Sequence, residues 1–336
     1  MPTLVPRERV ASLLADAPRH RVAIVGDAML DVYLRGEVDR ISPEAPVPVV
    51  RVRERKYALG GAANVAQNVA ALGARVELVA AVGGDAAGAT LRGMLGGIGA
   101  DPRGIVDADR PTTTKSRVLA RGQQVVRFDE EEDAELPPAE VARLAAAVRR
   151  AVDDADALVL EDYNKGVLVA PVITQAIAWA AERGIPVVVD PKYRNFFAYR
   201  GATVFKPNRR ELELALGAAV DLDHPDSLPD VFRRLGVDHL LLTLGDRGMA
   251  LFSAGGDVHR VPTTAREVYD VVGAGDTVTA YLATMLAAGA TAREAAVIAN
   301  FAAGVEVGKL GAATVTAEEV LAAYDAHVAD LAPVPA

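Results

Sequence analysis

The stretch "YDVVGAGDTV", residues 269–278, places an aspartate directly after two glycines and in front of a long apolar run. That run, 277–290, has the composition of a helix, so the glycines would form its leading turn. Backbone N–H groups there, bare of side chains at Gly273 and Gly275, would bind an anion, and the helix dipole would reinforce them. An ionised Asp276 suits a general base that takes a proton from a hydroxyl during phosphoryl transfer. The alternative is an ordinary N-cap aspartate beside a tight glycine turn.

The residue inventory limits which other chemistries the chain could support. The 336 residues include no cysteine, which excludes disulfides, a thiol nucleophile and a zinc–thiolate site. The five histidines are scattered without metal-ligand spacing. Carboxylates, amides, lysines, arginines and backbone N–H groups therefore remain as the reactive and binding groups.

Short β-branched runs alternate along the chain with alanine- and leucine-rich segments of helical length, which predicts a parallel sheet covered by helices on both faces. The strand candidates are 22–26, 76–83, 157–162, 185–190, 202–208 and 239–245. Polar residues or glycines follow each of these runs: Asp27, 83–85, Asp162, Asp190, Asn208 and 245–246. The carboxyl ends of parallel strands share one edge of a sheet, where open α/β sheets bind ligands, so we expect a site at this edge.

Two segments break the alternation. Residues 33–57 contain three prolines and an extended "VPVVRV", and residues 112–130 look like two strands around Arg121 and Gly122, a hairpin. Proline and charge suit a small, edge-rich sheet. We interpret the two segments as one β-flap, projecting from a single domain that spans 1–336, which could cover the site.

The charge balance argues against two classes of partner. A net charge of −9 disfavours non-specific binding to nucleic acid or to an anionic membrane. The N-terminal residues lack the apolar core of a signal peptide, and the longest apolar stretches fall short of about 20 residues. We therefore expect a cytoplasmic protein that acts on a small molecule, with no nucleic-acid or membrane partner.

Four motifs resemble one enzyme family. "DVVGAGDT" (270–277) resembles the C-terminal signature of the ribokinase-like (PfkB) carbohydrate kinases, and "GGAANVAQNVAALGA" (60–74) resembles the N-terminal one. "KPNRRE" (206–211) is similar to the Asn-x-x-Glu motif of that family, and "TLGDRG" (243–248) to its nucleotide-binding strand end. The resemblance runs in family order from about residue 20 to 320. It implies a three-layer α/β sandwich with a mostly parallel central sheet and a β-flap as a lid.

A narrower set of motifs is similar to the branch of this family that phosphorylates the anomeric hydroxyl of D-glycero-β-D-manno-heptose 7-phosphate on the way to ADP-heptose. The set comprises "GDAMLDVY", "RISPEAPVPVV", "TTTKSRV", "QQVVRFDEE", "DYNKG" and "VVVDPK". The chain ends soon after the kinase motifs, so the form without an adenylyltransferase domain is expected. A kinase of another sugar or nucleoside (ribose, fructose, adenosine) and a non-catalytic binding module stay open as alternatives.

The resemblance also implies roles for individual residues. Asp276 would be the base, and Gly273, Ala274 and Gly275 the anion hole that stabilises charge on the transferring phosphoryl group. ATP and Mg²⁺ are the implied cofactors, and a monovalent cation, K⁺, stays open. The nucleotide side would consist of Asn208, Arg209, Arg210, Glu211, Thr243, Gly245, Gly248 and Asn300. Glu211 would hold Mg²⁺ through water, although "NRRE" equally suits a helix N-cap and Asn300 a satisfied core amide.

On the sugar side the resemblance implies hydroxyl-binding groups and cations for a phosphate. The residues concerned are Asp31, Gly60, Gly61, Asn64, Arg117, Arg127, Asp162, Lys165, Asp190 and Lys192. Each of the cations could instead be a plain surface charge. Related kinases also suggest a homodimer through the flap, for which the exposed strand edges and the apolar "VPVV" are suitable.

Overall fold

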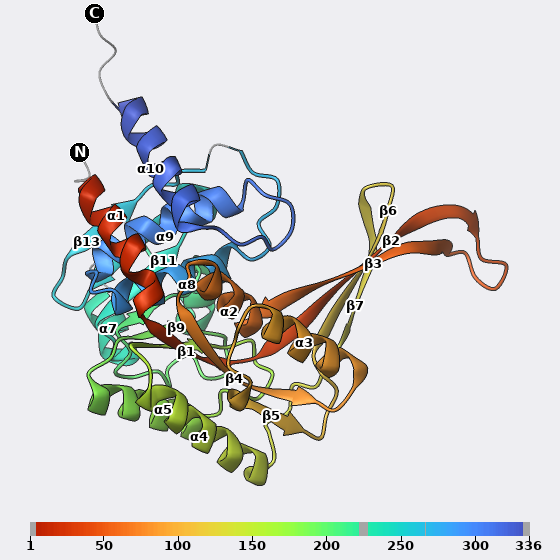
Figure 1. Cartoon of the computed structure of the whole chain (residues 1–336), viewed down its shortest axis with the longest axis horizontal. Coiled ribbons are helices and arrows are strands. Elements are labelled where there is room, and N and C mark those ends of the chain that lie inside the picture. Colours follow the sequence, from red (N-terminus) through yellow and green to blue (C-terminus); the bar gives the residue numbers. More distant parts are fainter. Residues whose placement is uncertain (1–4, 222–227, 266, 332–336) are drawn as a thin grey trace, which may run out of the picture.

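The computed structural model describes residues 5–221, 228–265 and 267–331. Over these residues the chain forms a nine-stranded sheet covered by helices on both faces, and a four-stranded sheet that extends away from this body (Figure 1). The strand order of the larger sheet is β13-β12-β11-β10-β9-β8-β1-β4-β5. The strands from β5 to β11 run parallel, whereas β12 and β13 are antiparallel additions at one edge. The mostly parallel α/β fold that the sequence predicts is confirmed.

The larger sheet consists of β1 (Arg21–Gly26), β4 (Arg75–Gly83), β5 (Ile105–Ala108), β8 (Ala157–Glu161), β9 (Val187–Asp190), β10 (Val204–Phe205), β11 (His239–Thr243), β12 (Met249–Ser253) and β13 (Val258–Val261). The α-helices are α1 (Arg7–Asp16), α2 (Ala62–Ala71), α3 (Ala86–Gly97), α4 (Pro138–Asp153), α5 (Ala170–Arg183), α6 (Arg209–Leu216), α7 (Leu228–Leu235), α8 (Ala274–Ala287), α9 (Ala292–Glu306) and α10 (Ala317–Leu331). Within the described ranges, none of these helices is long and apolar enough to cross a membrane.

The central strands are apolar on both faces, and each face packs into its own core. In β1, Val22 and Ile24 belong to the core that includes α2, α8 and α9, whereas Ala23 and Val25 point the other way into the core that includes α4 and α5. Alternate side chains of a strand point to opposite faces, so a strand between two helical layers needs an unbroken apolar run. This requirement explains why the strand pattern could be recognised in the sequence.

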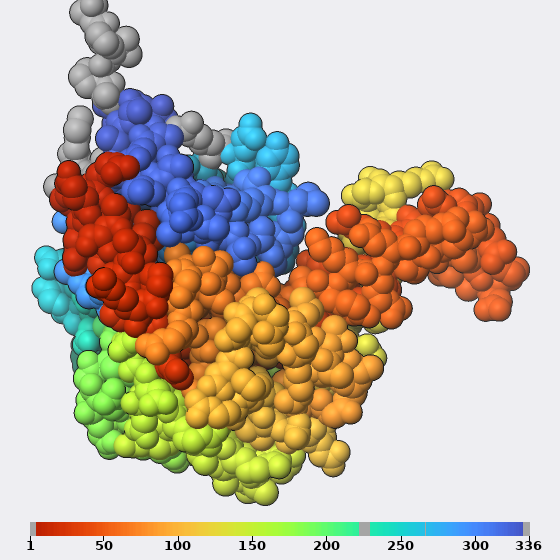
Figure 2. All heavy atoms as spheres, viewed as in Figure 1, coloured from red at the N-terminus to blue at the C-terminus, as the bar shows by residue number. Residues whose placement is uncertain are grey.

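The second sheet, which we call the flap, has the order β3-β2-β6-β7. Its strands are β2 (Ala28–Ile41), β3 (Pro48–Gly61), β6 (Thr114–Ala120) and β7 (Gln123–Glu130). Figure 2 shows it as an arm that protrudes from the globular body. The first pair of strands reaches beyond the expected 33–57 at both ends. β2 starts at Ala28, directly after β1, and β3 continues to Gly61, the pairing partner of Ala28.

The hairpin expected around Arg121 and Gly122 is confirmed. Both residues have positive φ, 51° and 78°, as tight hairpin turns of this kind require. β6 and β7 are antiparallel, and β6 pairs in parallel with β2. Two segments far apart in the sequence therefore form one sheet.

Candidate active site

Helix α8 begins at the glycine-rich turn. Gly273 is its N-cap with φ 99°, and Asp276 lies in the first helical turn. The predicted helix start is confirmed, but the alternative of Asp276 as an ordinary N-cap is wrong, because Gly273 occupies that position. A Cβ on Gly273 would lie 3.1 Å from Asn64 Nδ2 and 3.2 Å from Glu306 Oε1, in a backbone conformation that L-residues rarely adopt. The first N–H groups of a helix have no partner inside it, so this turn is suited to bind an anion.

Asp276 is held by hydrogen bonds to both of its oxygens. Asn64 Nδ2 donates to Oδ2 at 2.8 Å, and the Tyr163 hydroxyl donates to Oδ1 at 2.8 Å. The side chain is buried, with 6% of the residue exposed. Burial raises the pKa of Asp276 to about 6, although the two hydrogen bonds stabilise the carboxylate and act to lower the pKa. A carboxyl group that titrates near neutral pH suits a general base.

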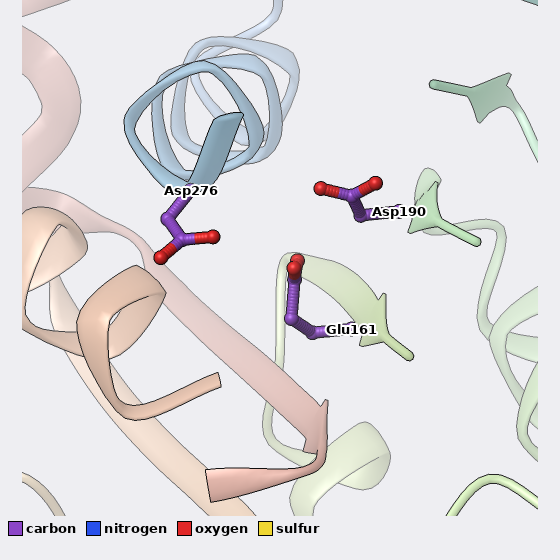
Figure 3. A group of neighbouring side chains, drawn as sticks. All are labelled: Glu161, Asp190 and Asp276. Atoms are coloured by element: carbon purple, nitrogen blue, oxygen red, sulfur yellow. The ribbon is translucent and has the colours of Figure 1, made fainter. Parts of the chain in front are cut away.

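Two further carboxyl groups face Asp276. Glu161 at the end of β8 and Asp190 at the end of β9 point toward it (Figure 3), with oxygen atoms of the three within 4.8 Å of one another. Among the residues that the structure describes, neither oxygen of the fully buried Glu161 has a hydrogen-bond partner. Burial, with Asp190 and Asp276 adding like charge, raises the pKa of Glu161 well above its ordinary value. This environment favours the protonated form of Glu161 more than an exposed position would.

A buried lysine balances this cluster. Lys206, which follows β10, donates to Asp190 Oδ2 at 2.6 Å and is only 3% exposed. Burial disfavours its ammonium, but Asp190 and Glu161 together raise the pKa of Lys206 above its ordinary value. The ion pair keeps the cluster ionic without a large net charge.

The loop that carries Tyr163 is anchored on a buried aspartate, Asp27, at the end of β1. Its carboxyl group accepts backbone N–H bonds from Tyr163 at 2.8 Å and Lys165 at 3.0 Å through Oδ2, and from Val167 at 3.2 Å through Oδ1. A Cβ on Gly166 would lie 2.1 Å from the Ala134 carbonyl oxygen. The path of this loop, and with it the position of the Tyr163 hydroxyl, is thus fixed by backbone contacts.

A cavity of about 290 Å³ opens beside the α8 turn. Its walls are largely apolar and include Met249, Val268, Val271 and Val278. Such a pocket suits a flat heterocycle with few polar contacts. Four residues expected on the nucleotide side line this cavity, Thr243, Gly245, Gly248 and Asn300, together with Ala274 and Gly275 of the predicted anion hole. Asn300 also donates to the Pro262 carbonyl oxygen at 2.9 Å, which fixes the neighbouring loop.

The Asn-x-x-Glu motif forms a capping box at the start of α6. Asn208 accepts from the Glu211 N–H, and Glu211 Oε2 accepts from the Asn208 N–H, both at 2.9 Å. Glu211 Oε1 pairs with Lys192 Nζ at 2.5 Å. Arg209 instead pairs with Glu213 along the helix, and Arg210 is exposed. Asn208 forms an isolated parallel β-bridge with Thr243, a residue of the cavity wall, so the motif lies next to the cavity.

The carboxylates here fit a hard cation by chemistry. Mg²⁺ prefers carboxylate oxygens and keeps several waters. Glu211 caps α6 with its side chain 18% exposed, and the buried Glu161 offers two oxygens without protein partners among the described residues. Oxygen donors of this type are compatible with a magnesium ion held partly through water.

The residues expected on the sugar side divide into two groups. Asp31, Gly60 and Gly61 pack tightly: a Cβ on Gly60 would lie 2.9 Å from Asp31 Oδ2, and one on Gly61 would lie 2.5 Å from the Asp27 carbonyl oxygen. By contrast, Asp162 turns inward and accepts the Tyr199 hydroxyl at 2.7 Å. Burial raises the pKa of Asp162 to about 6. Its backbone N–H lies 3.0 Å from the Asp190 carbonyl oxygen, but its carboxyl group is already engaged by Tyr199 and by the Asn164 N–H at 2.7 Å.

The expected phosphate-binding cations all have carboxylate partners. Arg117 pairs with Asp31 at 2.6 Å. Arg127 pairs with Asp129 at 2.5 Å, and Lys165 with Glu131 at 2.7 Å. Each of them is therefore held in a defined position.

Sequence reasoning missed Glu161, Tyr163 and Lys206. Glu161 and Lys206 each interrupt or end an apolar strand run with a charge, and that charge was the available signal. Tyr163 belongs to the "DYNKG" motif, but the motif gave it no role, because that role depends on a contact with a residue more than a hundred positions away.

The chain matches both bifunctional proteins and single kinases among its relatives. The chain is 46% identical over 327 residues to the Bifunctional protein HldE of Rhodospirillum rubrum, covering 95% of this chain and 65% of that protein. It is 47% identical over 319 residues to the D-beta-D-heptose 7-phosphate kinase of Bordetella bronchiseptica, covering 94% and 97%. The chain thus spans about two thirds of the length of the bifunctional relatives.

Among solved structures, ribokinase from Arabidopsis thaliana complexed with ribose and ATP matches with a TM-score of 0.71 at 22% identity, covering 90% of this chain and 98% of that one. Phosphofructokinase-2 from Escherichia coli in complex with potassium matches with a TM-score of 0.75 at 21% identity, covering 91% and 98%. These likenesses show the fold. The model of the pfkB family carbohydrate kinases matches residues 19–319, and the chain belongs to that family.

Proposed function

We propose that this chain phosphorylates the C1 hydroxyl of D-glycero-β-D-manno-heptose 7-phosphate with ATP and yields the 1,7-bisphosphate. The support is its 47% identity to the Bordetella bronchiseptica kinase of that name, over 97% of that protein. Because the chain spans only 65% of the bifunctional HldE relative, the proposal concerns the kinase reaction alone. We further propose that residues 1–336 act as one kinase domain in the cytoplasm.

The observation that carries the proposal is the position of Asp276 at the start of α8. There a buried carboxyl group lies beside backbone N–H groups and next to an apolar cavity that suits a nucleotide base. In our proposal Asp276 takes the proton of the sugar hydroxyl. The N–H groups of the turn, reinforced by the helix dipole, stabilise the charge on the transferring phosphoryl oxygens.

Other residues position the reactants. Asn64 and Tyr163 orient the Asp276 carboxylate through their hydrogen bonds. The flap excludes water, since an open site would hydrolyse ATP. Membership of the family implies ATP and a metal ion; we propose Mg²⁺, held by Glu211 through water, where it would neutralise phosphate charge. A requirement for K⁺ stays open in this proposal.

We also propose that two copies of the chain associate through their flaps. One face of the flap is apolar, because the strand register places Val52, Tyr57, Val126 and Phe128 on the same side. These residues are 37–49% exposed. A contiguous apolar surface of this kind is unfavourable in water and often marks a protein–protein interface. Light scattering should give the mass of a dimer; a monomer at working concentrations would refute the association without affecting the kinase proposal.

The direct test of function is ADP release across a panel of sugars. The panel contains heptose 7-phosphate, ribose, fructose, fructose 6-phosphate and adenosine, each with ATP and Mg²⁺. We expect the highest kcat/KM with heptose 7-phosphate. A clear preference for another member would overturn the proposed substrate, and no ADP release above the no-sugar background would overturn the proposed reaction.

A further inference from the structure

The flap has a charged face opposite its apolar one. The register of β6 with β7 pairs Lys115 with Asp129 and Arg117 with Arg127. Alternate residues of a strand point to the same side, so these side chains share one face. Glu131 follows directly after β7, in the connection that leads to α4.

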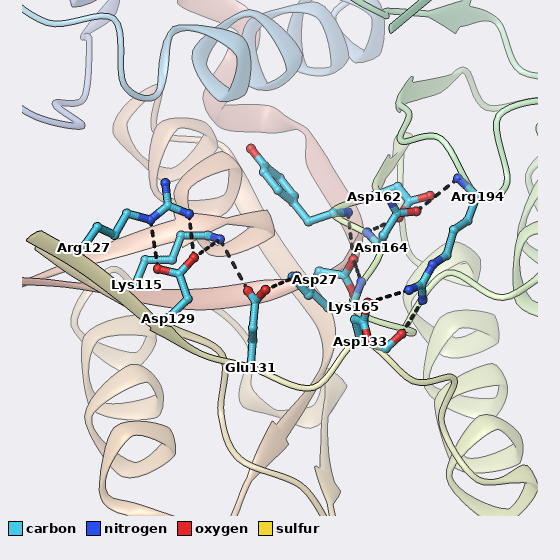
Figure 4. Close-up of polar contacts among 11 residues, drawn as sticks. Asp27, Lys115, Arg127, Asp129, Glu131, Asp133, Asp162, Asn164, Lys165 and Arg194 are labelled. Carbon is cyan, nitrogen blue, oxygen red and sulfur yellow. Dashed lines mark hydrogen bonds and ion pairs between the residues drawn. The ribbon is translucent and has the colours of Figure 1, made fainter. Parts of the chain in front are cut away.

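Ion pairs link this face to the body of the protein, as Figure 4 shows. Glu131 lies between two ammonium groups: its Oε1 is 2.7 Å from Lys165 Nζ, and its Oε2 is 3.6 Å from Lys115 Nζ. Lys115 also contacts Asp129 at 3.4 Å, and Arg127 binds Asp129 with two nitrogens, at 2.9 and 2.5 Å. The Arg127 guanidinium, with the neighbouring Lys115, lowers the pKa of Asp129 to about 2. Three cations therefore surround two carboxylates at the junction of flap and body.

The lysines of this cluster are unusually sheltered for cations. The side chains of Lys115 and Lys165 are 16% and 15% exposed. Two ammonium groups so placed need an anion between them, and Glu131 supplies a single negative charge. A phosphate carries up to two charges and three acceptor oxygens, so it would satisfy the same cations better than one carboxylate.

Glu131 is also the partner that can leave most easily. It lies outside the strands, in the segment between β7 and α4, and its side chain is 29% exposed. By contrast, Asp129 belongs to β7 and is fixed by Arg127. A movement of Glu131 would leave the backbone ladder of the flap intact.

One short loop connects the cluster to the candidate base. Lys165 is in the loop whose Tyr163 hydroxyl contacts Asp276, and Asp27 anchors both residues through their backbone N–H groups. A group bound at Lys165 and a hydroxyl presented to Asp276 would therefore be positioned by the same short segment. This arrangement is suited to a substrate that has an anionic group at one end and a reactive hydroxyl at the other.

We propose that Lys115, Arg127 and Lys165 form a subsite for the phosphate that a phosphorylated sugar already carries, and that this phosphate displaces Glu131. The inference rests on the proposed function in that the substrate is a sugar phosphate. It adds Lys115 to the expected cations and removes Arg117 and Lys192. Arg117 pairs with the buried Asp31 and its own side chain is 13% exposed, whereas that of Arg127 is 45% exposed and open to a ligand; Lys192 pairs with the helix-capping Glu211.

The test compares two substrates that differ only in the phosphate, heptose 7-phosphate and free heptose. The quantity is the selectivity ratio, kcat/KM for the first divided by kcat/KM for the second. Lys115→Gln should lower this ratio about tenfold or more, because a charged partner of the phosphate is lost. Glu131→Gln should raise it about threefold or more, because the competing carboxylate is gone. A ratio cancels any general loss of folded enzyme.

Arg51→Gln is the matched control. Arg51 is an ion-paired cation of the same flap, 3.6 Å from Asp39, and it lies several residues further along the strands, about 20 Å from the cluster at the usual rise per residue. This variant should leave the ratio unchanged. If Lys115→Gln lowered both kcat/KM values equally, or Glu131→Gln lowered the ratio, the subsite would be wrong.

Calorimetric binding of heptose 7-phosphate and free heptose without ATP separates this inference from the proposed function. Should the wild-type protein phosphorylate no sugar, yet bind the phosphorylated one with an affinity that falls in Lys115→Gln, the subsite would stand and the kinase proposal fail. Normal wild-type turnover of heptose 7-phosphate, with a ratio that is independent of Lys115, would refute the subsite and leave the kinase proposal standing.

Discussion

The Tyr163 hydroxyl donates a 2.8 Å hydrogen bond to Oδ1 of Asp276. The two residues come from different parts of the sheet edge, the loop after β8 and the first turn of α8. Burial and the neighbouring Asp276 raise the pKa of Tyr163 well above its ordinary value, so the hydroxyl stays a donor. The hydrogen bond stabilises the ionised form of Asp276, which is the form that a general base requires.

Tyr163→Phe should therefore shift the pH dependence of the reaction. The pKa of Asp276 is about 6, and activity falls as pH falls through it because the base becomes protonated. Removing a donor to the ionised form raises that pKa, so the acid limb of kcat/KM should move up by roughly 1 pH unit. Tyr57→Phe is the control, because Tyr57 lies on the apolar face of the flap, which faces away from the charged cluster. An acid limb at the same pH in both variants would show that Tyr163 does not tune the base.

Glu306→Gln should change how stability depends on pH. Burial, followed by the like charges of Asp270 and Asp276, raises the pKa of Glu306 from 4.5 to about 8. Between these values the folded protein keeps a proton that the unfolded chain releases, so the wild type loses stability as pH rises through this window. The variant lacks this loss. Its Tm relative to wild type should rise steadily from pH 5 to pH 8, measured by thermal unfolding. A constant difference would contradict the assignment.

Lys206→Met should destabilise the fold. Asp190 would remain buried, with 8% of the residue exposed, after losing the ammonium group now 2.6 Å away. Removing one partner of a buried ion pair costs about 3–5 kcal/mol. Urea unfolding measures this loss, with the exposed Lys56→Met as control. A loss below about 1 kcal/mol would mean that water or a local rearrangement solvates Asp190.

The sequence could predict much of the fold because its signals are local. Continuous apolar runs gave the buried strands, and Arg121-Gly122 gave the hairpin, since each depends on neighbouring residues alone. The polar residues at the strand ends were also recognisable, because Asp190 and Asn208 directly follow apolar runs. The glycine turn before Asp276 identified the start of α8 for the same reason.

What the sequence could not predict were pairings between distant segments. Asp162 and Asp190 look equivalent as strand-end carboxylates, yet Asp162 turns toward Tyr199 and Asp190 toward Lys206. Similarly, the contact of Glu131 with Lys165 requires the flap and the body to be placed together. Such contacts depend on the tertiary arrangement, which local patterns do not encode.

The most direct test of the central claim is ADP release by Asp276→Asn with heptose 7-phosphate as the acceptor, alongside its affinity for ATP and for the sugar phosphate. The amide keeps the size of the side chain but cannot accept the hydroxyl proton. We expect turnover to fall by roughly 10²–10⁴ while both affinities stay within a few-fold of wild type. Turnover equal to that of wild type would contradict the assignment of Asp276 as the base.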